Sequence, residues 1–120
     1  MTEETELDLR FTFDSDEAAE RAVAEIERRL GSLEEVNEIH ARVETMRTLE
    51  AAAAVVSVTL LVIHHAPGVV RDLRKLVQEI RNFIADFRPR QADADIGTER
   101  KEAVKLEAAD IERAPRRRRK

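Results

Sequence analysis

Three histidines are the residues of this chain whose type could bind a metal ion or transfer a proton. His64 and His65 are adjacent, and His40 is remote from them in the sequence. Adjacent side chains on a helix project about 100° apart, so this pair is poorly spaced to share one metal ion. Histidines beside the exposed carbonyl groups at the end of a helix are the simpler interpretation. We therefore predict no metal site.

Paired carboxylates are the next candidates, because general acid–base catalysis often uses two acidic side chains. Glu3-Glu4, Asp16-Glu17 and Glu34-Glu35 all lie in charged surroundings, whereas a catalytic pair usually needs an apolar pocket that shifts one pKa. The chain has no cysteine and no G-x-S-x-G motif, and its three glycines form no Gly-rich phosphate-binding loop. We predict no catalytic residue and no cofactor, and keep an enzyme subunit with an unusual site at His64 and His65 as the weakest hypothesis.

The C-terminal end carries a basic run in an otherwise acidic chain of net charge −4. Such a run binds anionic lipid or nucleic acid without specificity, at about 1 kcal/mol per basic residue near a charged membrane. It is also typical of a solubilising disordered end, so we predict a disordered basic tail over residues 113–120. Because the rest of the chain is acidic, we expect nucleic acid to bind only nonspecifically through this tail. The candidate electrostatic residues are Arg116, Arg117, Arg118, Arg119 and Lys120.

The elements that must position these residues begin with a strand and a helix. Apolar and polar side chains alternate over residues 6–13, and a period of two predicts a half-buried strand. Over residues 16–30 the apolar side chains recur at helical spacing, and Gly31 follows as a stop signal, so we predict a helix. The alternating apolar residues of the strand are Leu7, Leu9, Phe11 and Phe13.

Residues 33–47 fit two structures. Apolar side chains three to four residues apart favour a helix, as does intrinsic propensity. The segment from Ile39 to Glu44 also alternates between apolar and polar residues, which indicates a short strand that would complete a strand–helix–strand unit.

Residues 49–65 are the most apolar part of the chain. Four alanines lead into a run of valine, leucine and isoleucine without a charged side chain. We predict a helix that is apolar on every side and therefore buried in protein or lipid. A membrane span needs about 20 apolar residues, which this segment reaches only by extension to Val70 across Pro67-Gly68. A buried helix at the core or at a self-association interface is the first interpretation, and a single span over residues 49–70 with a cytosolic basic C-terminus is the alternative.

The last elements are a helix and a hairpin. Residues 69–87 carry a strong apolar stripe and predict an amphipathic helix. Residues 93–108 fit a helix by propensity, or a hairpin with strands at residues 93–97 and 103–108 and a turn signal at Gly97. The candidate interaction residues on the two apolar segments are Val55, Val58, Leu61, Val62, Leu73, Leu76, Ile80, Phe83 and Phe87.

The order of these features resembles the effector-associated constant component family of bacterial conflict systems. The matching pieces are LDLRFTF, DEAAERAVAEIERRL, EIHARVETMRTLEAAAAVVSVTLLV and DADIGTERKEAVKLEAADIE, which together cover roughly residues 6–112. Where the central segment of that family looks rich in glycine, this one is rich in alanine and valine. The resemblance implies strands in both ambiguous segments and a non-enzymatic accessory role beside an effector such as a peptidase.

We therefore expect one α+β domain over residues 1–112. Its small antiparallel or mixed sheet, formed by the N-terminal strand and the C-terminal hairpin, would pack on two to three helices, one of them very apolar. The expected function is a cytoplasmic adaptor or scaffold that binds a protein effector and associates with itself. The alternative is a small single-pass protein of the inner membrane.

Overall fold

The computed structural model describes residues 2–47, 52–65, 73–115 and 117–119. Strands and helices alternate along the chain in a βαββαβ order, and a short C-terminal extension follows. The elements are β1 (Thr2–Phe13), α1 (Asp16–Gly31), β2 (Val36–Arg47), β3 (Ala52–His65), α2 (Leu73–Phe87), β4 (Gln91–Ile96), β5 (Glu99–Glu102), the 3₁₀ turn η1 (Ala103–Lys105), α3 (Ala108–Arg113) and β6 (Arg117–Arg119).

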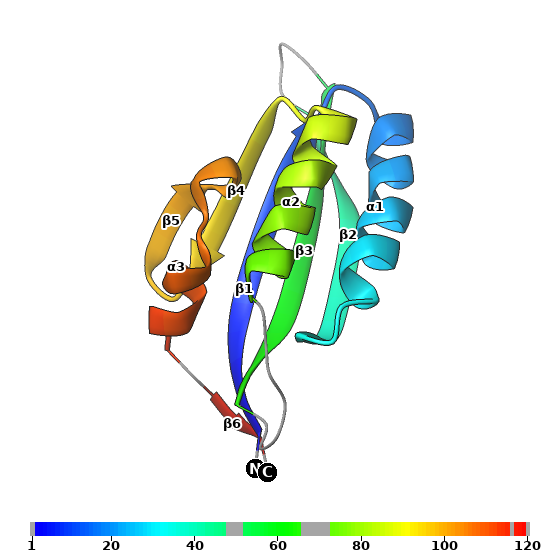
Figure 1. The fold of residues 1–120 in the computed structure, drawn as a ribbon. Coiled ribbons are helices and arrows are strands. Elements are labelled where there is room, and N and C mark those ends of the chain that lie inside the picture. Colours follow the sequence, from blue (N-terminus) through cyan, green and yellow to red (C-terminus); the bar gives the residue numbers. More distant parts are fainter. Residues whose placement is uncertain (1, 48–51, 66–72, 116, 120) are drawn as a thin grey trace.

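The described strands form an antiparallel sheet in the order β2-β3-β1-β4-β5, and β6 pairs with the start of β1. The first four of these strands, with α1 and α2 as their connections, have the ferredoxin-like split βαβ topology. Both helices lie on the same face of the sheet (Figure 1). The α+β class expected from the sequence is confirmed, as is the pairing of the N-terminal strand with a C-terminal hairpin.

The core lies between the sheet and the two long helices. Alternate residues of β1 and β3 point into it, and α1 and α2 cover them with one apolar stripe each. Phe83 of α2 contacts Phe11 of β1 edge to face, with ring centroids 5.0 Å apart, and stacks on Phe87 at 4.7 Å. The largest fully buried side chains are Leu7, Leu9, Phe11, Ile26, Leu30, Val56, Leu60, Leu76, Ile80, Phe83, Leu106 and Ile111.

The apolar helix predicted over residues 49–65 is wrong, because residues 52–65 form strand β3. This strand lies between β1 and β2, so both of its edges are paired. Apolar residues lie on both faces of β3, since Val55, Leu61 and Ile63 are on the side away from the helices, and this weakens the alternation that marks an amphipathic strand. The β-branched residues from Val55 to Ile63 favour a strand, and the preceding alanines obscured that signal.

Two further expectations concern the helices. The helix predicted over residues 16–30 is confirmed as α1, where the Ser15 hydroxyl accepts a hydrogen bond from the Ala18 amide and caps the N-terminus. The amphipathic helix predicted over residues 69–87 is confirmed from Leu73 onward, and residues 69–72 lie outside the described residues. None of the helices in the described part of the chain is long and apolar enough to cross a membrane.

The ambiguous segment of residues 33–47 is a strand from Val36 onward. It pairs with β3 along its whole length, with an irregularity between Val36 and Glu38. Ile39, Ala41 and Val43 pack against the core from this strand. The alternation in the sequence therefore outweighs the helical propensity, because pairing with β3 contributes packing and hydrogen bonds that propensity does not include.

The C-terminal hairpin exists, but its predicted limits are wrong. The turn lies at Gly97 and Thr98, and residues 99–102 form the second strand. Residues 103–108, predicted as that strand, form η1 and the start of α3 instead. Ala103 and Leu106 are buried, whereas Val104 is 46% exposed. The spacing of three between the buried residues suits a helical turn packed on α2, which η1 contacts.

The disordered tail predicted over residues 113–120 is also corrected. Residue Arg113 ends α3, and residues 117–119 form β6 against the first residues of β1. Strand β4 pairs with β1 only as far as Leu7, so the backbone of β1 before that residue is open to a further strand. The Thr5 hydroxyl donates a hydrogen bond of 3.2 Å to the Pro115 carbonyl and holds the incoming chain there.

Candidate functional site

The candidate interaction residues do not form one surface. Most of them lie in the core between the sheet and the helices, and Phe87 is half-buried at the end of α2. Val55 and Leu61 alternate with the core residues of β3 and belong to the opposite face of the sheet. The candidates buried in the core are Val58, Val62, Leu73, Leu76, Ile80 and Phe83.

The structure describes only some of the basic residues proposed as an electrostatic tail. Arg117, Arg118 and Arg119 have their backbone in β6, where Arg117 is the register partner of Glu4 and Arg118 of Glu3. Arg116 and Lys120 lie outside the described residues. The backbone of β6 is thus held beside an acidic strand.

The sheet face opposite α1 and α2 (Figure 1), called the open face here, has polar residues of β1 and β3 at its centre. Thr59 of β3 donates a hydrogen bond of 2.9 Å to Asp8 of β1. Asp95 of β4 pairs with Arg100 of β5 at 2.8 Å. The open face carries no tyrosine or tryptophan, because the chain has none. Base stacking on tyrosine or tryptophan is therefore excluded there.

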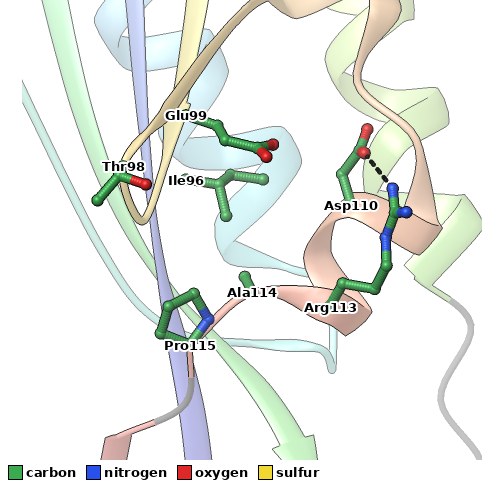
Figure 2. Close-up of a pocket in the computed structure, with 7 residues that line it drawn as sticks. All are labelled: Ile96, Thr98, Glu99, Asp110, Arg113, Ala114 and Pro115. Atoms are coloured by element: carbon green, nitrogen blue, oxygen red, sulfur yellow. Dashed lines mark hydrogen bonds and ion pairs between the residues drawn. The ribbon is translucent and has the colours of Figure 1, made fainter.

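A pocket of about 280 Å³ lies between the β4–β5 turn and α3, and Figure 2 shows its lining. Asp110 and Arg113 project into it from α3, and Glu99 from β5. The Asp110 carboxylate is buried and accepts hydrogen bonds from Lys101 Nζ at 2.7 Å, from the Glu107 amide at 2.9 Å and from Arg113 at 3.0 Å. The Lys101 contact fastens α3 to the hairpin, and the other two lie within α3 and its N-cap.

The contacts of Asp110 favour its charged carboxylate and indicate a structural role. The hydrogen bond from Lys101 lowers the pKa of the carboxyl group, the Glu107 amide and Arg113 lower it further, and desolvation opposes them. A general base at neutral pH works best with a pKa near that pH, which is the opposite direction. Asp110 is also the N3 residue of a capping box at the start of α3. The pocket therefore supports a structural role for its carboxylate.

Helices α1 and α2 are joined on the surface by Arg29. Its guanidinium contacts Glu25 at 2.8 Å on its own helix and Asp86 at 2.7 Å on α2, and it lies 5.9 Å from the centre of the Phe87 ring. A planar guanidinium suits this combination of two carboxylates and one aromatic face. One groove beside Arg29 is lined by charged residues of both helices, among them Glu79 and Asp86 of α2.

The two outer strands of the sheet differ sharply. β5 has four residues, all charged, and Lys101 ties it to α3. β2 has twelve residues and ends the sheet on the other side, where its outward backbone groups form what we call the β2 edge. Natural proteins prevent unwanted pairing at the exposed edges of their sheets with short strands, charges, prolines or covering segments. β5 is both short and entirely charged, whereas β2 is long, contains no proline and alternates apolar residues with charged and polar ones.

The side chains along the β2 edge divide into two rows. Ile39, Ala41 and Val43 are half-buried on the side of α1. On the open face, a row of charged and polar residues has large exposed fractions: Glu38 38%, His40 78%, Arg42 76% and Glu44 41%. Arg42 pairs with Glu44 at 2.8 Å, and His40 lies 3.8 Å from Glu38.

Sequence reasoning missed this edge as a site. The alternation of residues 39–44 was visible, but the position of a strand at the edge or the centre of a sheet depends on long-range pairing. The hypothesis of an enzyme site at His64 and His65 stays a prediction, because the side chains of these two residues lie outside the described part; His40 is exposed on β2. Among the described residues, no group of three or more histidine, aspartate or glutamate side chains is arranged to hold a metal ion.

No protein-family model, curated protein or solved structure matches the chain. The resemblance to the effector-associated constant component family stays a prediction.

Proposed function

We propose that this chain is a non-enzymatic interaction module that binds protein partners by adding a strand at the β2 edge. The observation that carries the proposal is the contrast between the two outer strands. The β5 side is short, charged and fastened to α3, whereas β2 has twelve residues and pairs regularly with β3 from Glu38 onward. A partner segment in extended conformation would continue the sheet there.

The energetics of strand addition suit an adaptor. Each main-chain hydrogen bond contributes about 0.5–1.5 kcal/mol, so several of them give useful affinity with little dependence on the partner's sequence. Selectivity would come from the two rows of side chains on β2. Ile39, Ala41 and Val43 would contact alternate apolar residues of the partner, and the charged row would select against unsuitable partners.

The class of partner rests on the sequence. The resemblance to the effector-associated constant component family supports an effector protein of a bacterial conflict system, such as a peptidase, as the protein that this module recruits. The absence of cysteine agrees with a reducing cytoplasm, where we place it.

The test uses a library of random peptides displayed on phage, because it requires no known effector. We expect selected peptides to bind the wild-type chain and to lose at least tenfold in affinity for Ala41→Lys, since a lysine that points inward from an edge strand opposes strand addition. Ala109→Lys introduces the same side chain at an exposed position on α3 and should bind like the wild type. Equal binding to the wild type and both variants would place the peptide site elsewhere and contradict the proposal.

A further inference from the structure

We infer that the partner that fits the β2 edge is a second copy of this chain, paired antiparallel across a two-fold axis. This inference rests on the proposed function, because it uses the same edge. It specifies which molecule binds the edge and the register in which the two β2 strands pair. The two sheets would then continue into each other through two adjacent β2 strands.

The charge pattern of the open face is complementary to itself. In an antiparallel pair with His40 on the two-fold axis, Arg42 of each copy lies opposite Glu38 of the other. This register forms two opposite-charge pairs, one on each side of the axis. Arg42 is 76% exposed and Glu38 38% exposed, so both side chains are accessible from the edge.

Neighbouring registers are less favourable. A shift that puts Ala41 on the axis brings Glu38 opposite Glu44 of the other copy twice. A shift that puts Arg42 on the axis brings the two Arg42 residues together. Like charges directly opposite each other destabilise a strand pair. A shift to Val43 also pairs Arg42 with Glu44, and the experiment below separates it from the register with His40 on the axis.

The other row of β2 agrees with the same register. With His40 on the axis, Ile39 of each copy lies opposite Ala41 of the other, on the side of the sheet that α1 covers. Both residues are half-buried in one chain and pack against its core. Pairing would bury more of their apolar surface, and an isologous contact gives both copies the same gain.

The size of this contact predicts a weak dimer. Stable protein interfaces bury about 1,600 Å² in total, and a contact made by one strand of each copy buries less than that. We therefore expect dimerisation that depends strongly on protein concentration. A covalent trap is a better detector of such a dimer than size-exclusion chromatography.

Single-cysteine variants provide that trap, because the chain has no cysteine of its own. Two residues on the axis of an antiparallel pair have Cα atoms about 4.5–5.5 Å apart, within the range for a disulfide. We expect His40→Cys to form a disulfide-linked dimer under mild oxidation. Arg42→Cys should not, because its two copies would lie four residues apart along the strands, or about 14 Å. Thr98→Cys, exposed at the β4–β5 turn, is the control for random collisions.

Charge exchange tests the register independently in a chain that keeps His40. Arg42→Glu should lower dimerisation at least fivefold in sedimentation velocity, and the double variant Glu38→Arg with Arg42→Glu should restore it. The proposed register would be overturned if the double variant Glu44→Arg with Arg42→Glu restored dimerisation instead and Val43→Cys formed the disulfide-linked dimer. All charge-exchange positions are exposed or half-exposed, and circular dichroism checks that each variant is folded.

The outcomes also separate this inference from the proposed function. If His40→Cys cross-links no faster than Thr98→Cys, self-pairing is overturned. If the selected peptides in that case still bind the wild type and not Ala41→Lys, the β2 edge remains the binding surface. Peptides that bind both equally would contradict the proposed function as well. Rapid cross-linking of His40→Cys, with rescue by the Glu38–Arg42 exchange, supports the dimer.

Discussion

Lys101 Nζ lies 2.7 Å from Asp110 Oδ1, and this ion pair joins the last strand of the main sheet to helix α3. The contact holds α3 against the β4–β5 hairpin. η1 contacts both α2 and β4, and α3 contacts α2, so the C-terminal segment covers the hairpin (Figure 1). The opposite outer strand, β2, is where strand addition is proposed.

Replacement of Asp110 by Ala is predicted to lower the free energy of unfolding by about 1–3 kcal/mol. The substitution removes a buried carboxylate and leaves its donors, among them the Glu107 amide, without this acceptor. Urea denaturation followed by circular dichroism measures the change. Lys101→Met keeps the aliphatic part of the lysine and should cost less, because that side chain is 38% exposed. A loss for Asp110→Ala below about 0.5 kcal/mol would show that the network is not stabilising.

The pH dependence of stability should report on Glu25. Hydrogen bonds from Arg28 and then Arg29 lower the pKa of the Glu25 carboxyl group from 4.5 to about 2. A carboxyl group whose pKa is lower in the folded state stabilises the fold above its unfolded pKa and loses that effect as pH falls towards the folded value. The stability difference between wild type and Glu25→Gln should therefore be constant above pH 4.5 and shrink between pH 4.5 and 2.

Thermal unfolding at a series of pH values measures this difference. Glu20→Gln, an exposed position on the same helix, is the control for removal of one negative charge. A difference that stays constant down to pH 2 would contradict the assignment of the lowered pKa to Glu25.

Two residues with positive φ should respond to substitution in opposite directions. Gly97 has φ 58°, and a Cβ there would lie 3.1 Å from Pro115 Cδ, so Gly97→Ala should destabilise the chain by about 1–2 kcal/mol. Arg88 follows α2 with φ 48°, so Arg88→Gly should stabilise it by up to about 1 kcal/mol.

Arg88→Ala is the matched control, because it removes the charge and keeps the Cβ. Urea denaturation of the three variants tests the pair of predictions. If Arg88→Ala stabilises the chain as much as Arg88→Gly does, the gain in stability comes from removal of the arginine side chain and not from the backbone conformation.

The prediction of each strand from the sequence depended on whether its two faces differ in polarity. β1 shows its alternation because Leu7, Leu9 and Phe11 face the core and their neighbours face the polar open face. The amphipathic helices α1 and α2 cover one face of the sheet only, so their stripes were visible as well. β1 and β3 are both paired on two edges, but β3 also carries apolar residues on the face that α1 and α2 do not cover, where Val55 is buried. Periodicity could not distinguish it from a buried helix.

The candidate site at the β2 edge was harder to predict from the sequence than the fold was. Burial of Leu73, Leu76 and Phe83 is what an apolar stripe predicts, but the stripe alone cannot tell a core contact from a binding contact. The alternation at the β2 edge was visible in the sequence. Its meaning depends on β2 being outermost, and that follows from the order of strands that are distant in the chain.

Amide hydrogen exchange along β2 tests the central claim most directly, because it observes the backbone groups that strand addition would use. In an antiparallel outer strand, alternate amides point away from the sheet and exchange rapidly in a monomer. We predict that these amides between Glu38 and Glu44 exchange more slowly when a selected peptide is added or the protein concentration is raised, and that Ala41→Lys removes this protection. Rapid exchange that neither peptide nor protein concentration changes would contradict the account.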